Sequence, residues 1–326
     1  MSQNADQEPG QNLPQIQHSG AIRLVLPATS ANLGPGFDSV GLAMALTLTV
    51  EAEAAPAPDA QLLTIQATGR DADRCARTSN NLIFETYRDL LERAGHAVTP
   101  LDLRIHNEIP LSMGFGSSAA ALLAGVYLAN HFGGLGWDRQ ECMEEACRRE
   151  GHPDNVAACA LGYLTVSTVV ADSGGDWVMA ATCGEKTPWK LLLALPSASL
   201  ATEKARALLP AQYSRADVVA NLQRTALLVS AFALGRGDLL RVAMQDRLHQ
   251  PYRMEACPLL PGLLPLAGEE GVLGVALSGA GPAVLLVIEQ EAADAVAARI
   301  RHAAADPSLE IIATAIAPGA QQSCSG

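Results

Sequence analysis

The sequence has few aromatic residues, few basic residues and no long hydrophobic run. Aromatic residues make up 4% of the 326 residues, and 22 Lys and Arg face 34 Asp and Glu, for a formal net charge of −12. Nucleic acids and anionic membranes are bound through basic patches, so we expect neither among the partners of this chain. The longest apolar stretches, such as Ala119–Ala129 and Ala283–Ile288, are well under the roughly 20 residues that span a bilayer.

Paired cysteines and a secretory signal are also missing. The seven cysteines are odd in number and form no Cys-x-x-Cys pair, so neither a disulfide framework nor a structural zinc site is indicated. Residues 1–20 are rich in Gln, Asn, Ser, Pro and Gly and lack a basic start followed by an apolar run. We therefore expect a disordered N-terminal tail and reduced thiols in a cytoplasmic protein.

The chain does have enough apolar sequence for large cores, with 49% hydrophobic and 17% charged residues. Its length predicts two domains, and we place the boundary near residues 175–190. Alternation and helical spacing predict a mixed α+β class. Strands are expected at 22–27, 40–53, 62–68, 101–109, 163–170, 189–195, 272–278, 283–289 and 309–317, and helices at 80–94, 119–130, 138–149, 202–209, 215–234, 238–248 and 291–303. Residues 29–38 and 111–118 are predicted to be loops because glycine and proline interrupt them.

The segment Gly114–Ala119 lies between a predicted strand and a predicted helix, and three functions compete for it. It matches the Gly-x-Gly-x-x-Ala dinucleotide fingerprint, but Asp138 opens another helix where that motif needs an acidic residue closing a strand. A Walker loop is excluded because no Gly-Lys-Ser/Thr follows. A phosphate cradle fits, since backbone amides and a helix N-terminus attract anions. A tight turn that binds nothing is the structural alternative.

Two other segments carry weaker signals. Ser278–Pro282 joins two predicted strands, so it is either a hairpin turn or a backbone surface that lets a ligand approach closely. Gly151–Asn155 follows a predicted helix, and a lone histidine there is more often structural than functional. No His/Glu spacing indicates zinc, and no Gly-x-Ser-x-Gly elbow indicates a hydrolase.

Six motifs follow one another along the chain: PATSANLGPGFDSVGLA (27–43), PLSMGFGSSAAALLAG (110–125), EGHPDNVAA (150–158), ATEKARALLP (201–210), DRLHQPYR (246–253) and GVALSGAGPAVL (274–285). Together they resemble the homoserine kinase family of the GHMP small-molecule kinase superfamily over roughly residues 21–318. The resemblance implies a ribosomal protein S5 domain 2-like domain over residues 21–180 that holds ATP, and a ferredoxin-like domain over residues 181–320. The active site would lie between the two domains, and residues 1–20 would be the tail.

The resemblance implies sites for ATP and Mg²⁺. Asn81 would lie near the adenine, and Ser118 with Glu150 would hold the magnesium ion, with Glu144 and Glu145 as alternatives on the same helix. Ser112-Met113 departs from the usual loop, which often has a small residue and then Arg, so no side-chain role is assigned to these two positions. The residues that would surround ATP are Pro110, Leu111, Ser112, Met113, Gly114, Phe115, Gly116, Ser117, Ser118, Ala119 and Ala120.

The resemblance also implies a pocket for L-homoserine, which carries an ammonium, a carboxylate and a primary hydroxyl. Asp38 suits the ammonium, and the planar guanidiniums of Arg206 and Arg253 suit the carboxylate, although either arginine alone would be read as a surface ion pair. The pocket would be lined by Asn32, Asp38, His152, Thr202, Arg206, Arg253 and Gly279.

The expected catalytic residues are Asn155, Ser118 and Glu150. Several superfamily members carry an aspartate where Asn155 stands, and an amide cannot accept a proton as a base. We therefore expect the substrate hydroxyl to attack directly or to pass its proton toward the phosphate, with Asn155 orienting it and Asp38 as the competing candidate for a base.

Three functions follow in order of preference. The first is an ATP-dependent kinase that transfers phosphate to the alcohol group of homoserine in threonine biosynthesis. The second is a kinase for another small alcohol, such as mevalonate, a sugar or a hydroxylated amino acid; sugars have no zwitterion for the Asp38 and arginine set. The third is a non-catalytic ligand-binding protein, which the intact Ser117, Ser118 and Glu150 disfavour. A homodimer is common in the superfamily, and the sequence does not determine the oligomeric state.

Overall fold

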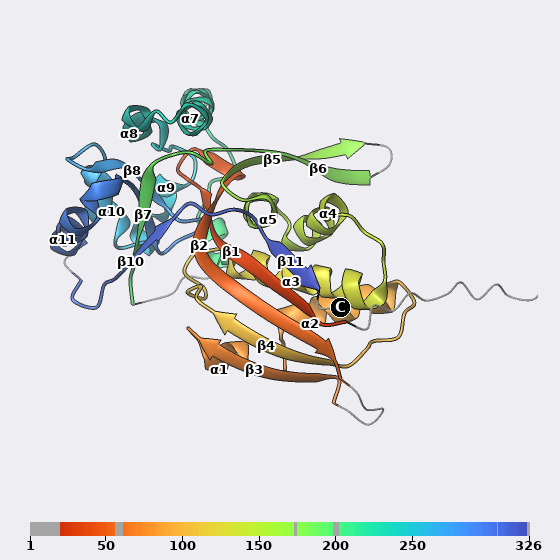
Figure 1. The fold of residues 1–326 in the computed structure, drawn as a ribbon. Helices are drawn as coiled ribbons and strands as arrows, with labels where there is room; N and C mark the ends of the chain where they lie inside the picture. The colour runs from red at the N-terminus through yellow and green to blue at the C-terminus, as the bar shows by residue number, and fades with distance from the viewer. Residues whose placement is uncertain (1–19, 56–60, 173–174, 198–201, 305, 325–326) are drawn as a thin grey trace, which may run out of the picture.

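Two β-sheets organise the chain in the computed structural model (Figure 1). The structure describes residues 20–55, 61–172, 175–197, 202–304 and 306–324, and of residues 202–204 it describes the backbone only. The predicted tail therefore lies almost entirely outside the described residues. Within the described part, no helix is both long enough and apolar enough to cross a bilayer.

The first sheet has seven strands, and its centre carries the first glycine-rich motif. Five of the strands follow the order β11-β1-β2-β4-β3, while β5 pairs with both β2 and β6. All pairs are antiparallel except β3 with β4. The strands are β1 (Ile22–Asn32), β2 (Gly36–Ala54), β3 (Leu63–Gly69), β4 (Leu101–Asn107), β5 (Leu164–Asp172), β6 (Gly175–Cys183) and β11 (Gln321–Cys324).

Helices with many small residues cover this sheet. α3 has an alanine-rich sequence that is buried over most of its length, which lets it pass beneath β1 and β2. α5 approaches β2 so closely that a Cβ at Gly41 would overlap the backbone of Asp154. The close approach brings the first turn of α5 beside the start of β2. The helices are α1 (Ala72–Cys75), α2 (Leu82–Arg93), α3 (Ser117–Gly133), α4 (Arg139–Glu150) and α5 (Asp154–Leu161).

The second sheet is antiparallel with the order β10-β7-β9-β8, which is the split βαβ arrangement of a ferredoxin-like fold. It lies at one end of the first sheet, with α10 and α11 on its outer side and α7 and α8 at the top of the view (Figure 1). Its strands are β7 (Trp189–Leu195), β8 (Val272–Leu277), β9 (Val284–Glu289) and β10 (Glu310–Ala315), and its helices are α6 (Thr202–Ala207), α7 (Arg215–Leu234), α8 (Leu240–Ala243), α9 (Gln250–Arg253), α10 (Leu260–Leu263) and α11 (Ala293–Ala304). Short 3-10 turns lie at 237–239, 254–256, 264–266 and 290–292.

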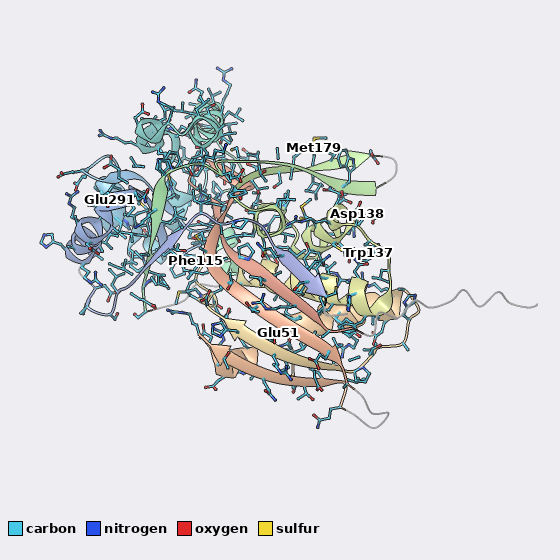
Figure 2. The ribbon with its side chains drawn as sticks, viewed as in Figure 1. Glu51, Phe115, Trp137, Asp138, Met179 and Glu291 are labelled. Carbon is cyan, nitrogen blue, oxygen red and sulfur yellow. The ribbon has the colours of Figure 1, made fainter. Side chains whose placement is uncertain are left out.

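Phe115 lies among the side chains where the two sheets approach each other (Figure 2). It is 1% exposed and belongs to the larger apolar core, whereas Glu51, Met179 and Glu291 lie on the outer surface. A large side chain in the middle of a glycine-rich loop is unusual for a solvent-facing segment. Its burial anchors the loop at the junction of the two sheets.

Several predicted elements are confirmed, and the reason is local sequence. α7 and β7 have the predicted bounds of 215–234 and 189–195. Asp138 caps α4 as predicted, and it forms a capping box in which Asp138 and Glu141 each accept from the other's backbone amide. α7 has a Ser214 N-cap and a Gly235 C-cap, β7 is a nearly continuous apolar run, and α4 has its capping box, so tertiary context changed little.

Other predictions are wrong. Residues 29–38 are not one loop: β1 runs to Asn32, only residues 33–35 form the turn, and β2 starts at Gly36, because cross-strand bonds with two bulges override the glycines. The helix expected at 238–248 ends at Ala243, since the carboxylate of Asp246 binds the following amides and stops the helix. The sequence analysis did not predict α1, α5, α9, α10, β6 or β11.

The division at residue 180 stays a prediction. The chain leaves the first sheet at Cys183 and enters the second at Trp189. It then returns, since Ile316 bridges to Met44 and Pro318 bridges to Gly162, so the end of the predicted second domain lies on the first sheet. The structure pairs none of the seven cysteines in a disulfide.

Candidate active site

Three segments that are far apart in the sequence meet at one cleft of about 200 Å³. The amide of Thr29 donates to the carbonyl of Phe115 at 3.0 Å, and the amide of Gly279 donates to the carbonyl of Ala31 at 3.1 Å. Ser278 Oγ lies 2.8 Å from the carbonyl oxygen of Gly114. These bonds join the first hairpin, the glycine-serine loop and the Ser278–Pro282 turn around a common space.

The glycine-serine loop ends at the N-terminus of α3 in a conformation that requires glycine. Gly114 and Gly116 have φ of 88° and 66°, and a Cβ at Gly116 would overlap Thr29 Oγ1. Gly116 is the N-cap of α3 and no side chain caps the helix, so its first-turn amides keep their donor capacity. Ser117 and Ser118 line the cleft at this point. The helix end and the two hydroxyls together form a site suited to an anion.

Glu150 is the acidic residue of α4 that faces this loop. Ser118 Oγ donates to Glu150 Oε2 at 2.9 Å, and burial raises the pKa of Glu150 although His152 and the Ser118 hydrogen bond oppose the rise. Glu144 and Glu145, the two other candidates for the magnesium ligand, contact residues outside the cleft. Glu144 accepts from Gln140 at 2.7 Å and Glu145 pairs with Arg149 at 2.7 Å, and neither lines the cleft.

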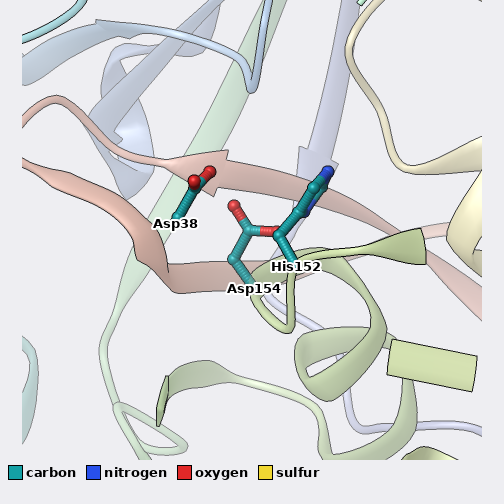
Figure 3. A group of neighbouring side chains, drawn as sticks. All are labelled: Asp38, His152 and Asp154. Carbon is teal, nitrogen blue, oxygen red and sulfur yellow. The ribbon is translucent and has the colours of Figure 1, made fainter. Parts of the chain in front are cut away.

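His152 and Asp154 follow α4 and lie near Asp38 (Figure 3), and all three line the cleft together with Asn155. Asp154 Oδ1 lies 2.6 Å from His152 Nδ1 and accepts from the Asn155 amide at 2.7 Å. Burial lowers the pKa of His152, but the hydrogen bond and charge of Asp154 outweigh it, so the pKa is raised. The amide side chain of Asn155 is held on both sides, because Thr29 Oγ1 donates to its Oδ1 at 2.8 Å and its Nδ2 donates to Asp154.

Asp38 and Arg206 form a two-pronged ion pair across the mouth of the cleft. The Oδ1 and Oδ2 atoms of Asp38 accept from the two terminal nitrogens of Arg206 at 2.7 and 3.1 Å. The pair is about one third exposed on each side. Asp38 has a positive φ of 55°, and its amide donates to Asn32 Oδ1 at 3.0 Å. Strained backbone at a residue that faces a cleft is typical of a functional position.

Arg253 is buried behind this pair, at 1% exposure. Its guanidinium lies 5.7 Å from the centre of the Phe37 ring, and that of Arg206 lies 5.5 Å from the same ring. Burial lowers the pKa of Arg253, and the charge of Arg206 acts in the same direction. Within the described ranges, no carboxylate lies within ion-pair distance of Arg253. A buried cation that lines a cleft without an acidic partner favours an anionic ligand there.

Most of the predicted site residues line this one cleft. Thr202 begins α6, but its side chain lies outside the described part of the chain. The predicted residues that line the cleft are Asn32, Asp38, Ser112, Gly114, Phe115, Gly116, Ser117, Ser118, Glu150, His152, Asn155, Arg206, Arg253 and Gly279.

Asn81 and Leu111 line a separate, more apolar pocket of about 150 Å³ that shares Ser117 with the cleft. Asn81 is also the N-cap of α2, since its side chain accepts from the Phe84 amide at 3.2 Å. Helix capping therefore explains an asparagine at position 81 as well as the predicted contact with adenine does. Four other predicted residues line neither pocket: Pro110, Met113, Ala119 and Ala120.

Comparison with known proteins shows which family has this sequence and fold. The N terminal domain of GHMP kinases matches residues 81–163, and the GHMP kinases C terminal domain matches residues 228–306. A homoserine kinase from Solibacter usitatus is 45% identical over 269 residues, which cover 82% of this chain and 86% of that protein. The chain belongs to the homoserine kinase family. Another member, from Synechocystis, is 38% identical and covers 87% of this chain and 92% of its own.

Solved structures of the homoserine kinase family and its superfamily share the whole fold. The homoserine kinase from Cytophaga hutchinsonii matches with a TM-score of 0.76 at 24% identity, covering 96% of this chain and 100% of that one. The L. major mevalonate kinase in complex with R-mevalonate matches with a TM-score of 0.72 at 14% identity, covering 94% and 98%. The predicted GHMP kinase fold is confirmed by these likenesses.

Four residues that line the cleft were missed from the sequence, namely Ala31, Phe37, Asp154 and Ala280, as was buried Thr29, which donates to Asn155. Each lies inside a motif that had been singled out. Ala31 and Phe37 precede Asn32 and Asp38, Asp154 stands between His152 and Asn155, and Ala280 follows Gly279. Their roles depend on which neighbours they contact, and a motif does not contain that information.

Proposed function

We propose that this protein transfers the γ-phosphoryl group of ATP to the side-chain hydroxyl of L-homoserine, giving O-phospho-L-homoserine and ADP in threonine biosynthesis. One observation carries the proposal. An uncapped helix N-terminus with two serines, a serine–glutamate pair and a set of one carboxylate and two guanidiniums all face the same cleft. The first two elements suit a nucleotide phosphate, and the third suits an amino acid.

The donor side of the cleft fits a nucleotide. The first-turn amides of α3 would bind phosphate oxygens, assisted by the helix dipole and by the hydroxyls of Ser117 and Ser118. The adjoining apolar pocket at Asn81 would take the adenine. Backbone amides would bind the phosphates without a basic side chain, so an acidic protein with a net charge of −12 can bind them.

Ser118 and Glu150 would hold Mg²⁺, because a hydroxyl and a carboxylate 2.9 Å apart are oxygen ligands of the kind that this ion prefers. When bound, the ion neutralises charge that develops on the phosphate oxygens. Glu150 must be deprotonated to act as a ligand. The raised pKa of this carboxyl therefore makes metal binding sensitive to acid.

The acceptor side fits a zwitterion. The substrate ammonium would replace the Arg206 guanidinium at Asp38, and the carboxylate would be bound by Arg206 and Arg253. Asn32 and Gly279 border this space and are linked by a 3.1 Å hydrogen bond from Asn32 Nδ2 to the Gly279 carbonyl. An alcohol without both charges would leave at least one of these groups unpaired.

Asn155 would orient the attacking hydroxyl, and no side chain is needed to remove its proton. The contacts to Thr29 and Asp154 fix the orientation of the Asn155 amide, and an amide does not accept a proton at neutral pH. The proton would pass toward the transferred phosphate. The test is the pH–rate profile of Asn155→Ala, Asp38→Asn and Asp154→Asn. Loss of turnover in either aspartate variant with unchanged homoserine affinity would make that aspartate the base.

The function itself is tested by coupled ADP release with homoserine, serine, threonine and mevalonate as acceptors. We expect kcat/KM for homoserine to exceed that for each of the others by at least about 100-fold, because a missing methylene or an unpaired charged group is penalised to that extent. Preference for mevalonate would favour a kinase of another small alcohol. No acceptor-dependent ADP release with any of the four would overturn the assignment.

A further inference from the structure

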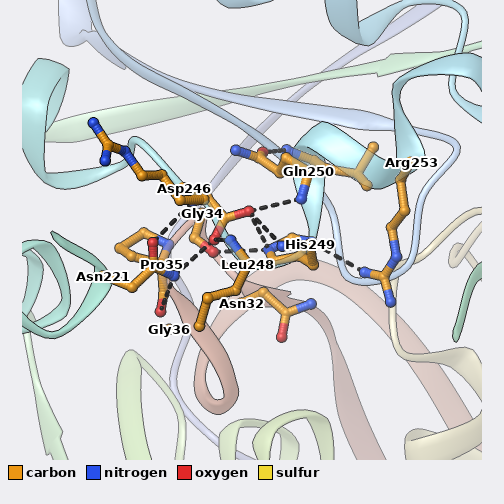
Figure 4. A network of polar contacts seen from close by, with 12 residues as sticks. Asn32, Gly34, Pro35, Gly36, Asn221, Asp246, Leu248, His249, Gln250 and Arg253 are labelled. Carbon is orange, nitrogen blue, oxygen red and sulfur yellow. Dashed lines mark hydrogen bonds and ion pairs between the residues drawn. The ribbon is translucent and has the colours of Figure 1, made fainter. Parts of the chain in front are cut away.

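A second polar network lies directly behind the acceptor side of the cleft, and the proposed reaction does not use its central residue (Figure 4). Asp246 is fully buried and accepts from the amides of Leu248, His249 and Gln250 at 2.9, 2.8 and 2.6 Å. The Asn221 side chain donates to it at 2.7 Å. These bonds hold the segment that runs from Asp246 into α9 in one conformation.

His249 lies at the centre of this network and is fully buried. Its Nε2 is 2.8 Å from the Gly34 carbonyl oxygen, and its Nδ1 is 3.1 Å from Arg253 Nη1. A carbonyl only accepts and a guanidinium only donates, so the ring carries its hydrogen on Nε2 and accepts at Nδ1. Burial lowers the pKa of His249, and Arg253 acts in the same direction although Asp246 opposes it. The ring is therefore neutral in a single tautomer.

The contacts of Arg253 leave one part of its guanidinium for the cleft. Its Nε donates to the Ala205 carbonyl at 3.2 Å, and its Nη1 is shared between His249 and the Gly279 carbonyl at 3.4 Å. Among the described residues, Nη2 has no acceptor. Because a guanidinium is planar, fixing Nε and Nη1 also fixes the direction of Nη2.

We propose that His249 is a positioning residue that gives the site its selectivity for a carboxylate, by holding Nη1 of Arg253 so that Nη2 is presented to the substrate. The inference rests on the proposed function and deepens it. His249 also joins the arginine to the Gly34 turn, which separates Asn32 from Asp38.

Two variants separate the two hydrogen bonds of the ring. The amide oxygen of asparagine takes the place of Nδ1, so His249→Asn keeps the acceptor for Arg253 and loses the donor to Gly34. The amide nitrogen of glutamine takes the place of Nε2, so His249→Gln keeps the donor to Gly34 and loses the acceptor for Arg253. Both remove the ring that packs 5.4 Å from Phe37, so each controls for lost packing in the other.

The experiment measures KM for homoserine and the inhibition constant of 3-aminopropan-1-ol, which is homoserine without its carboxylate, against homoserine. For His249→Gln we expect KM to rise by about 10- to 100-fold, as for loss of a hydrogen bond to a charged group. For His249→Asn we expect less than about a 3-fold change. The inhibition constant and KM for ATP should change by less than about 3-fold in both variants.

A double variant supplies the decisive arm. If His249 acts through Arg253, adding His249→Gln to Arg253→Ala raises KM by less than about 2-fold beyond Arg253→Ala alone. Independent, multiplying effects would overturn the proposal, as would equal losses in His249→Asn and His249→Gln. Thermal unfolding of each variant checks that the fold is retained. A wild-type protein inactive with homoserine would instead contradict the proposed function, which keeps the two failures distinct.

Discussion

The part of the cleft proposed to bind ATP, here the donor half, and the part proposed to bind homoserine, here the acceptor half, are built by different means. The donor half is one continuous segment, from Ser112 to the first turn of α3, and its groups are largely backbone amides. The acceptor half takes single side chains from separate elements, including Asp38 of β2, Arg206 of α6 and Arg253 of α9. The difference teaches that a backbone cradle accepts any phosphate, whereas separately placed charges recognise one arrangement of ligand groups.

Removing the buried charge of Arg253 should impair homoserine binding without impairing ATP binding, and we expect this to be the largest effect of the variants. We expect Arg253→Ala to raise KM for homoserine by about 10²–10³-fold, because truncating one partner of a buried charge pair costs about 2–5 kcal/mol. KM for ATP should change by less than about 3-fold. Arg236→Ala is the matched control, since Arg236 is exposed and pairs only with exposed Asp238. An equal rise in both KM values would place Arg253 in the donor half.

A Glu150→Gln variant tests the metal site proposed between the two halves of the cleft. We expect Glu150→Gln to lower kcat by about 10²-fold, because the amide keeps a contact to Ser118 but loses the charge that would hold the metal ion. Glu145→Gln is the control, since Glu145 pairs with Arg149 outside the cleft. Steady-state ADP release measures both. If Glu145→Gln lowers kcat as much as Glu150→Gln, the metal site proposed for Glu150 is wrong.

Adding a methyl group at Gly116 should disturb the backbone of the donor half. We expect Gly116→Ala to lower kcat/KM by about 10-fold or more with every acceptor, because the Cβ would overlap Thr29 Oγ1 and φ is 66°. Gly136→Ala is the control, since Gly136 has a φ of 72° but open space around its Cβ position. It should cost about 1 kcal/mol of stability without affecting activity. Comparable activity losses in both variants would show that backbone strain alone explains the effect.

Acidification should weaken the metal site and leave the rest of the donor half intact, with the smallest effect. The folded pKa of Glu150 lies above its ordinary value of 4.5. As the pH falls through that raised pKa the carboxylate is protonated, so the Mg²⁺ concentration for half-maximal activity should rise by about 3- to 10-fold. Titrations of Mg²⁺ across the mildly acidic range measure this rise. It should be absent in Glu150→Gln.

The raised pKa of Glu150 has the opposite consequence for stability. Because its folded pKa exceeds its unfolded value, the protein loses stability as the pH rises through that interval and the buried carboxyl ionises. Glu150→Gln should therefore raise the melting temperature at neutral pH while lowering activity. A fall in melting temperature would mean that the Ser118 contact outweighs the burial of the charge.

The conformation of the glycine-serine loop could be predicted from sequence because it depends on neighbouring residues. Glycines at 114 and 116 indicate the turn, and the alanine-rich segment directly after them indicates where the helix begins. The choice between Glu150 and its neighbours could not be made in this way. Glu144, Glu145 and Glu150 lie on one short helix, and only the packing of α4 against α3 brings Glu150 to Ser118.

The hairpin at residues 29–38 and the network behind Arg253 show the same limit. Three breaking residues close together predicted a loop, but pairing of β1 with β2 kept both ends in strands and confined the turn to residues 33–35. His249 had no recognisable role in its motif. The positioning role proposed for it depends on the Gly34 carbonyl and the Arg253 guanidinium lying on opposite sides of one ring.

By itself, the sequence determined which backbone can form a phosphate cradle, which segments are helices with strong caps, and which charged residues are available. Those properties depend on residues within a few positions of one another. The tertiary structure decided which of these charges face a common cleft and which tautomer the buried histidine adopts. The physical reason is that hydrogen bonds and ion pairs depend on distances between atoms, and those of the acceptor half join residues separated by up to 247 positions in the chain.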